Sequence, residues 1–117
     1  MERVHRPWGW YETLTNGDGY LIKRLWIDPG QRLSLQRHQH RLEHWYVASG
    51  SGDVSLDGQL LQAHPGSSFD VPCGCVHRAT AGTEGLLIVE IQRGAILRED
   101  DIERFADDYG RVPVAVR

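Results

Sequence analysis

The sequence predicts an all-β protein, a barrel or sandwich of short strands with one short helix near its C-terminus. Runs rich in β-branched and aromatic residues recur at regular spacing, with Gly, Pro or Asp between them. No helical periodicity appears before residue 95, which excludes βαβ units. The length of 117 residues suits one domain, 1–117, with the barrel at about residues 20–93 and a helical segment at about 99–109.

The predicted strands follow a lead-in over residues 1–19, in which Asn16 and Gly17 suggest a tight turn. A hairpin turn is expected at Asp57 and Gly58. The strand-forming runs share a high content of β-formers and end at turn residues; they are YLIKRLWID (20–28), LSLQRHQH (33–40), EHWYVAS (43–49), DVSLDG (53–58), QLLQAH (59–64), SSFDVP (67–72), VHRATA (76–81) and LLIVEIQR (86–93).

The last twenty residues change in character. In EDDIERFADDYGR, acidic residues crowd the start and Gly110 stands where a helix would stop. The apolar residues fall at helical spacing: Ile102, Phe105, Ala106 and Tyr109. We therefore expect a short amphipathic helix that covers the barrel, followed by VPVAVR as a loose tail or an edge strand added to a neighbour.

Composition narrows the class of partner. A net charge of −3 and a pI near 6.0 give no reason to expect nucleic acid, and no apolar run approaches membrane-spanning length. The first residues carry charges and lack the apolar core of a signal peptide. Cys73 and Cys75 are too close in sequence to form an unstrained disulfide, which indicates free thiols. We expect a cytoplasmic protein.

Metal-ligating side chains are concentrated between Gly30 and Gly50. Side chains alternate in direction along an extended strand, so Gln36, His38 and His40 point to one face. After a turn at Arg41 and Leu42, a returning strand can bring the Glu43 carboxylate back beside His38. Imidazole and carboxylate groups suit divalent zinc, iron, manganese, nickel and cobalt. The clustered residues are Gln36, His38, His40, Glu43 and His44.

Two stretches resemble the paired motifs of the cupin superfamily, a jelly-roll barrel also described as a double-stranded β-helix. The first motif reads Gly30, five residues, Gln36, one residue, His38, four residues, Glu43, six residues, Gly50. The second reads Gly66, five residues, Pro72, one residue, Gly74, two residues, His77, three residues, Ala81. Gln36 and Ala81 depart from the usual histidine and asparagine. The resemblance implies one divalent metal ion, for which zinc is the first candidate. Its implied ligands are Gln36, His38, Glu43 and His77.

Other interpretations of these residues stay open. A second register would pair His38 with His40, with Glu43 or His44 behind them, but it would leave Gly30 two residues too far away. A barrel could also keep these polar residues without a metal. Cys73 and Cys75 alternate along the chain with the proposed ligand at position 77. One of them could serve as a reserve thiolate ligand, or both could be small buried residues that fill space in a tight turn.

Longer segments resemble the C-terminal domain of type II mannose-6-phosphate isomerases over residues 6 to 111. These segments are RPWGWYE, KRLWIDPGQRLSLQRHQHRLEHWYVASG and EDDIERFADDYGR. The resemblance implies a metal-dependent isomerase that interconverts mannose 6-phosphate and fructose 6-phosphate through an enediolate. Two alternatives remain: a non-catalytic cupin that binds a sugar phosphate or nucleotide sugar, and a dioxygenase, which Gln36 disfavours.

The remaining site residues are assigned by chemistry. Glu90, His40 and Lys23 are the candidates for proton transfer; Glu90 lies in an otherwise apolar run that would raise its pKa. Arg78 and Arg32 are the candidates for binding the phosphate of a small sugar phosphate, since a guanidinium group can bind phosphate through two hydrogen bonds. The resemblance to cupins, which commonly pair through their outer strands, implies a homodimer, and exposed apolar edge residues and the VPVAVR tail are compatible with it.

Overall fold

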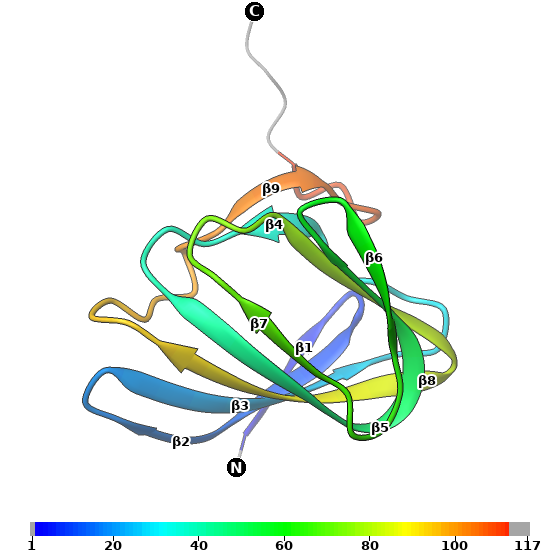
Figure 1. Cartoon of the computed structure of the whole chain (residues 1–117), viewed down its shortest axis with the longest axis horizontal. Coiled ribbons are helices and arrows are strands. Elements are labelled where there is room, and N and C mark those ends of the chain that lie inside the picture. Colours follow the sequence, from blue (N-terminus) through cyan, green and yellow to red (C-terminus); the bar gives the residue numbers. More distant parts are fainter. Residues whose placement is uncertain (1, 113–117) are drawn as a thin grey trace, which may run out of the picture.

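The computed structural model describes residues 2–112, which form nine strands curled into a barrel (Figure 1). The all-β class and the barrel are therefore confirmed. The strands are β1 (Arg3–Arg6), β2 (Gly9–Gly17), β3 (Tyr20–Ile27), β4 (Leu35–Arg37), β5 (Leu42–Leu56), β6 (Gln59–Ala63), β7 (Ser68–Val71), β8 (His77–Arg93) and β9 (Glu103–Ala106).

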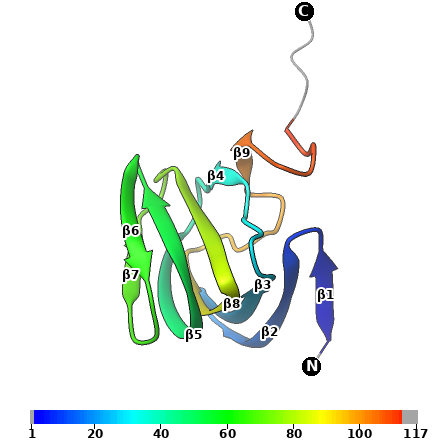
Figure 2. The same cartoon turned by 90° about the vertical axis from the view of Figure 1, so that its right-hand side faces the viewer.

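Two long strands hold the barrel together. β8 pairs with β3, β4 and β5, while β5 also pairs with β6 and β7. Figure 2 shows β5, β6 and β7 on one side of the molecule and β1, β2 and β3 on the other, with β4 and β9 together at one end. Register shifts between β5 and β8 fall at Val47/Ser49 and Gly50/Gly52, where β5 bends from one part of the sheet into the next.

Some predicted boundaries were wrong. The runs 43–49 and 53–58 are one strand, β5, and the runs 76–81 and 86–93 are one strand, β8. β2 continues through Gly17, so its turn lies at the next two residues, 18 and 19. The hairpin turn at Asp57 and Gly58 is confirmed, and both residues have positive φ.

The barrel interior has an apolar part and a polar part. The apolar part is packed from alternate residues of β3, β5 and β8, including Ile27, Val47 and Ile88. The polar part is unusual because burying polar or charged groups is unfavourable unless they are paired. Its buried members are Lys23, His38, Arg41, Glu43, His77, Glu90 and Gln92.

The predicted C-terminal helix was wrong, and no helix occurs in residues 2–112. Residues 103–106 form β9, which pairs with β4, and Arg37 of β4 donates to both carboxylate oxygens of Glu103. Asp101 accepts hydrogen bonds from the backbone N–H groups of Gln39 and His40 instead of starting a helix. Tertiary pairing therefore outweighs the local helical pattern. Residues 113–117 of the predicted tail lie outside the described part.

No helix in residues 2–112 is long and apolar enough to cross a membrane.

Replacing Asp107 by asparagine should destabilise the protein by about 1–2 kcal/mol at pH 7. The side chain and backbone N–H of Arg111 bind Asp107, whose pKa is lowered to about 2 from 3.8, chiefly by the Arg111 hydrogen bonds. Because this pKa is depressed on folding, the stabilisation is complete above pH 4 and is lost as the pH falls towards 2. Urea unfolding at pH 7 and at pH 2 measures it.

The matched control for this change is Asp108→Asn, next in sequence. Asp108 pairs with Arg32 at the surface, where both side chains are 42% exposed, so its loss should destabilise the protein less than the loss of Asp107. Equal losses in the two variants at pH 7, or a loss in the Asp107 variant that does not shrink at low pH, would contradict the assignment.

Candidate metal centre and ligand cavity

Three separate strands bring the candidate ligands to one place. β4 supplies Gln36 and ends just before His38, β5 supplies Glu43 near its start, and β8 begins with His77. Gln36 and His77 are direct cross-strand partners, so their side chains lie on the same face of the sheet. Glu43 returns on β5 after a short turn and points inward, because its neighbours in sequence point outward.

The donor atoms converge. His38, Glu43 and His77 are all buried, and one ligand atom from each lies within 4.8 Å of the others. Glu43 Oε2 is 3.3 Å from Nε2 of His38, and Glu43 Oε1 is 3.8 Å from Nε2 of His77. Nε2 of Gln36 lies 3.4 Å from Nε2 of His38. Two imidazoles and a carboxylate at this spacing form a group that can hold a metal ion.

Both histidine rings are oriented by backbone carbonyls. His38 Nδ1 donates to the carbonyl oxygen of Asp101 at 2.7 Å, and His77 Nδ1 donates to that of Cys75 at 2.9 Å. Each Nε2 therefore carries a lone pair directed toward Glu43. Nε2 of His77 is buried and has no hydrogen-bond partner among the described residues. A buried acceptor without a donor, on a ring fixed from behind, fits a metal ligand.

Burial keeps both rings neutral. It lowers the pKa of His38 to about 4, with a further lowering from the Arg41 charge. Burial also lowers the pKa of His77. Neutral imidazole is the form that binds metal, so at pH 7 a cation would not have to displace a proton from either ring.

Arg41 and Trp45 hold the carboxylate. Arg41 Nε donates to Glu43 Oε2 at 2.8 Å, and Trp45 Nε1 donates to Glu43 Oε1 at 2.9 Å. The Arg41 guanidinium also lies 3.3 Å from Nε2 of His38. Positive charge thus already stands where the donors converge, and a bound cation would share Glu43 with Arg41 or displace it.

Gln36 can adapt to a metal through its own neighbour. The Ser34 hydroxyl donates to Gln36 Oε1 at 2.6 Å, and the Gln36 amide nitrogen faces His38. A hydroxyl group both donates and accepts, so Ser34 can equally hold the amide nitrogen and leave the oxygen free for a cation. The four predicted ligands therefore fit a divalent ion.

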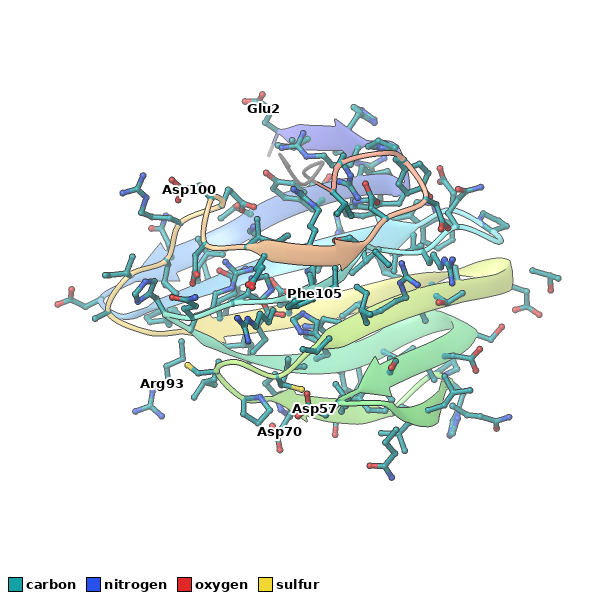
Figure 3. The ribbon with its side chains drawn as sticks, turned by 90° about the horizontal axis from the view of Figure 1, so that it is seen from above. Glu2, Asp57, Asp70, Arg93, Asp100 and Phe105 are labelled. Atoms are coloured by element: carbon teal, nitrogen blue, oxygen red, sulfur yellow. The ribbon has the colours of Figure 1, made fainter. Side chains whose placement is uncertain are left out.

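A cavity of about 130 Å³ adjoins this centre and is lined by Gln36 and His38. Figure 3 views the molecule from the end covered by β9, which carries Phe105. Two acidic side chains, Glu90 and Glu99, face a larger number of cations on the cavity wall. These cations are Arg6, Lys23, Arg41, Arg104 and Arg111.

Glu90 is a cavity carboxyl group whose pKa is raised toward neutral pH. Burial, and then the Glu43 charge, raise its pKa to about 7. Gln92 Nε2 donates to Glu90 Oε1 at 2.5 Å, and Trp45 Nε1 donates to Glu90 Oε2 at 3.2 Å. A carboxyl group with such a pKa can accept or give up a proton near neutral pH beside a bound ligand.

The structure brings some predicted site residues to the cavity and not others. Lys23 and Glu90 line it, whereas His40 lines a separate surface hollow of about 410 Å³. Arg32 forms two hydrogen bonds with Asp108, and Arg78 donates to the carbonyl oxygens of residues 33 and 106. Neither arginine lines the cavity.

The structure also arranges the alternative metal donors. His40 does not belong to the buried donor group. The donors that meet are those of the motif alignment that uses Gln36 and His38, not of the one that pairs His38 with His40. The His44 side chain is 43% exposed, and its Nδ1 lies 2.7 Å from Oδ1 of Asp70, a residue at the edge of the molecule in Figure 3. Cys73 is exposed and Cys75 is buried, and both are free thiols.

Arg6, Arg104 and Arg111 are the cationic cavity residues that sequence reasoning missed. The helical interpretation of residues 99–109 put no special weight on Arg104. Arg104 lies on β9 and Ile102 directly precedes this strand, so alternation along the extended segment puts both on the same side, and both line the cavity. The alternation of residues 102 and 104 would have indicated Arg104, but only if this segment had been assigned as a strand and not as a helix.

Comparisons with solved structures define the class as a cupin fold. The structure of KdgF from Halomonas sp. has a TM-score of 0.76 and 20% identity, and the match covers 86% of this chain and 90% of that one. An RmlC-like cupin from Shewanella frigidimarina has a TM-score of 0.74 and 24% identity, covering 85% and 86%.

The family follows from the sequence. The family model described as "Mannose-6-phosphate isomerase C-terminal" matches residues 1–107, and the chain belongs to this family. Mannose-1-phosphate guanylyltransferase of Escherichia coli is 43% identical over 110 residues, which are 93% of this chain and 23% of that protein. Alginate biosynthesis protein AlgA of Pseudomonas aeruginosa is 45% identical over 109 residues, 92% and 23%. The chain thus spans about a quarter of the length of these relatives.

These relatives correct the predicted function. The sequence resemblance implied an isomerase acting on mannose 6-phosphate and fructose 6-phosphate, but the relatives are named for guanylyl transfer or for alginate and xanthan biosynthesis. The isomerase prediction was therefore wrong. The relatives are enzymes of carbohydrate metabolism that carry a domain of this family.

Proposed function

We propose that this chain is a metal-binding cupin domain that takes a phosphorylated sugar of the mannose series into its cavity. One observation carries the proposal: the lone pairs of two buried histidines and one carboxylate converge beside a cavity whose wall carries more cationic than acidic side chains. The name of the Escherichia coli relative, mannose-1-phosphate guanylyltransferase, supports this ligand class. Guanylyl transfer itself is not carried over, because the match covers 23% of that protein.

Each group has a role in this proposal. Gln36, His38, Glu43 and His77 would hold one divalent ion, for which zinc suits the nitrogen and oxygen donors. A bound ion would supply positive charge to sugar oxygens. Glu90, protonated or ionised near neutral pH, exchanges hydrogen bonds with a sugar hydroxyl group.

The charge of the wall favours an anionic ligand. A neutral sugar would leave the half-buried Arg104 without an anionic partner, whereas a phosphate dianion offers three strong acceptor oxygens. Lys23 is already matched by Glu99, and Arg41 by Glu43, so part of the positive charge remains for a ligand.

Calorimetry with the zinc-loaded chain tests the ligand. We expect mannose 1-phosphate to bind at least about tenfold more tightly than mannose, because charge-assisted hydrogen bonds are the stronger ones. We also expect its affinity to fall when the metal is removed with a chelator. Equal affinity for mannose and its phosphate, or an affinity that chelation leaves unchanged, would count against the proposal.

The location and assembly are part of the same proposal. The two free thiols favour the reducing cytoplasm. A homodimer would cover the exposed outer side chains of Tyr20, Tyr46 and Ile91, which lie on neighbouring strands. Light scattering that shows only monomer at micromolar concentration would remove the dimer.

A further inference from the structure

Arg104 lies next to the metal centre although it is far from it in sequence. It is the cross-strand partner of Gln36 in the pairing of β9 with β4. Directly paired residues share a face of the sheet, and both residues line the same cavity. The Arg104 guanidinium is therefore presented to whatever ligand lies beside the metal donors.

Arg104 lacks an anionic partner. Within residues 2–112 its side chain forms no hydrogen bond or ion pair, and its Nε is buried with no acceptor. Two other arginines on the cavity wall, Arg41 and Arg111, are bound by Glu43 and Asp107 respectively. A buried donor without an acceptor is costly, so such a group is expected where a ligand supplies the acceptor.

Like charges surround this guanidinium. Burial lowers the pKa of Arg104, the nearby charges of Arg111 and Arg6 lower it further, and Asp107 acts in the opposite direction. One carboxylate thus faces three cations. The imbalance is relieved by an added anion, and most effectively by one that carries two charges.

We propose that Arg104, assisted by Arg111 and Arg6, binds the phosphate group of the ligand, while the metal centre binds the sugar end. This inference rests on the proposed function and identifies the residues that select a phosphorylated ligand. The planar fork of Arg104 can donate two parallel hydrogen bonds to phosphate oxygens. The pairing of β9 with β4 holds it there, anchored by the Arg37–Glu103 pair.

Several molecules carry this chemistry. Inorganic phosphate, a sugar phosphate and a nucleotide sugar all present phosphate oxygens. Titrating the zinc-loaded wild type with inorganic phosphate, mannose 1-phosphate and GDP-mannose separates these sources. A preference for mannose 1-phosphate assigns a sugar monophosphate, and equal affinity for inorganic phosphate assigns the free ion.

The test is Arg104→Gln in the zinc-loaded full chain. We expect its affinity for inorganic phosphate and for mannose 1-phosphate to fall about ten- to hundredfold, with zinc affinity unchanged. Arg104→Lys, which keeps the charge but loses the fork, should lie between wild type and Arg104→Gln. The midpoint of thermal unfolding without ligand should not fall, because no pairing within the described residues is lost.

The control is Arg98→Gln. Arg98 is 69% exposed, pairs with Asp100 and does not line the cavity, so its loss removes one positive charge and leaves the pairing of β9 with β4 intact. Phosphate affinity should stay at the wild-type value. Equal phosphate affinity in Arg104→Gln and wild type, an equal loss in Arg98→Gln, or no phosphate binding by wild type at millimolar concentration would overturn the inference.

The two proposals fail separately. Zinc affinity of the wild type reports on the proposed metal centre, and the difference between Arg104→Gln and wild type in phosphate affinity reports on this inference. Phosphate binding that requires Arg104 in a chain without zinc affinity would sink the metal centre and leave the phosphate site standing.

Discussion

Replacing His77 by alanine should lower zinc affinity by more than about a hundredfold, because losing a ligand costs more than losing a residue that only orients one. The same change should abolish the stabilisation of the fold by zinc, which in the wild type is about 2.7 kcal/mol at a hundredfold excess over Kd. His77 is the ring whose buried Nε2 has no other partner among the described residues. Competition titration and thermal unfolding with and without zinc measure both effects.

His44→Ala is the control. His44 is 43% exposed, pairs with Asp70 and points away from the cavity, so zinc affinity should stay at the wild-type value. His77→Leu covers the case in which alanine leaves the barrel unfolded, since leucine fills most of the same volume and offers no ligand atom. A folded position-77 variant that binds zinc as tightly as the wild type would refute the role of His77.

Replacing Gly50 by alanine should destabilise the fold by about 4 kcal/mol or more. A Cβ at this position would lie 2.1 Å from the carbonyl oxygen of Gly85, and the backbone φ is +85°. Backbone atoms of two paired strands cannot move apart without breaking the bend of β5. Urea unfolding of the purified variant, or loss of soluble folded protein, measures this effect.

Gly58→Ala is the control that separates two causes of lost stability: the steric clash of an added Cβ and the cost of a left-handed backbone conformation. Gly58 has nearly the same φ, +83°, but a Cβ there would meet nothing within 4 Å. Its substitution should therefore cost only about 1–2 kcal/mol, the price of a left-handed conformation. Similar losses at the two positions would mean that the strands do not approach closely at Gly50.

The parts of the site that were predictable depend on local rules. Alternation along a strand puts Gln36 and His38 on one side, and a short turn brings Glu43 back, 3.3 Å from His38. These relations span eight positions of sequence. The distant His77 required the resemblance between motifs, because no local rule pairs β4 with β8.

The parts that failed depend on distant contacts. EDDIERFADDYGR has a helical pattern, yet Arg37 and the edge of β4 hold residues 103–106 as a strand. Arg104 could not be assigned to the cavity without that pairing. Arg32 and Arg78 were chosen for their chemistry, but Asp108 and backbone carbonyls engage them away from the cavity.

The predicted reaction failed for another reason. A fold and a ligand set do not determine which chemistry a family carries out, because function depends on the groups around the site. The relatives are much longer than this chain and are named for another reaction. What the residues do support is a buried metal centre next to a cationic cavity.

The most direct test of that centre is the nitrogen NMR spectrum of ¹⁵N-histidine-labelled protein during zinc titration. Before zinc, His38 and His77 should be neutral at pH 7 with the proton on Nδ1, as their carbonyl acceptors require. One equivalent of zinc should shift Nε2 of these two rings and leave His44 unchanged. Zinc binding that shifts other histidines, or no shift at Nε2 of His38 and His77, would contradict the account.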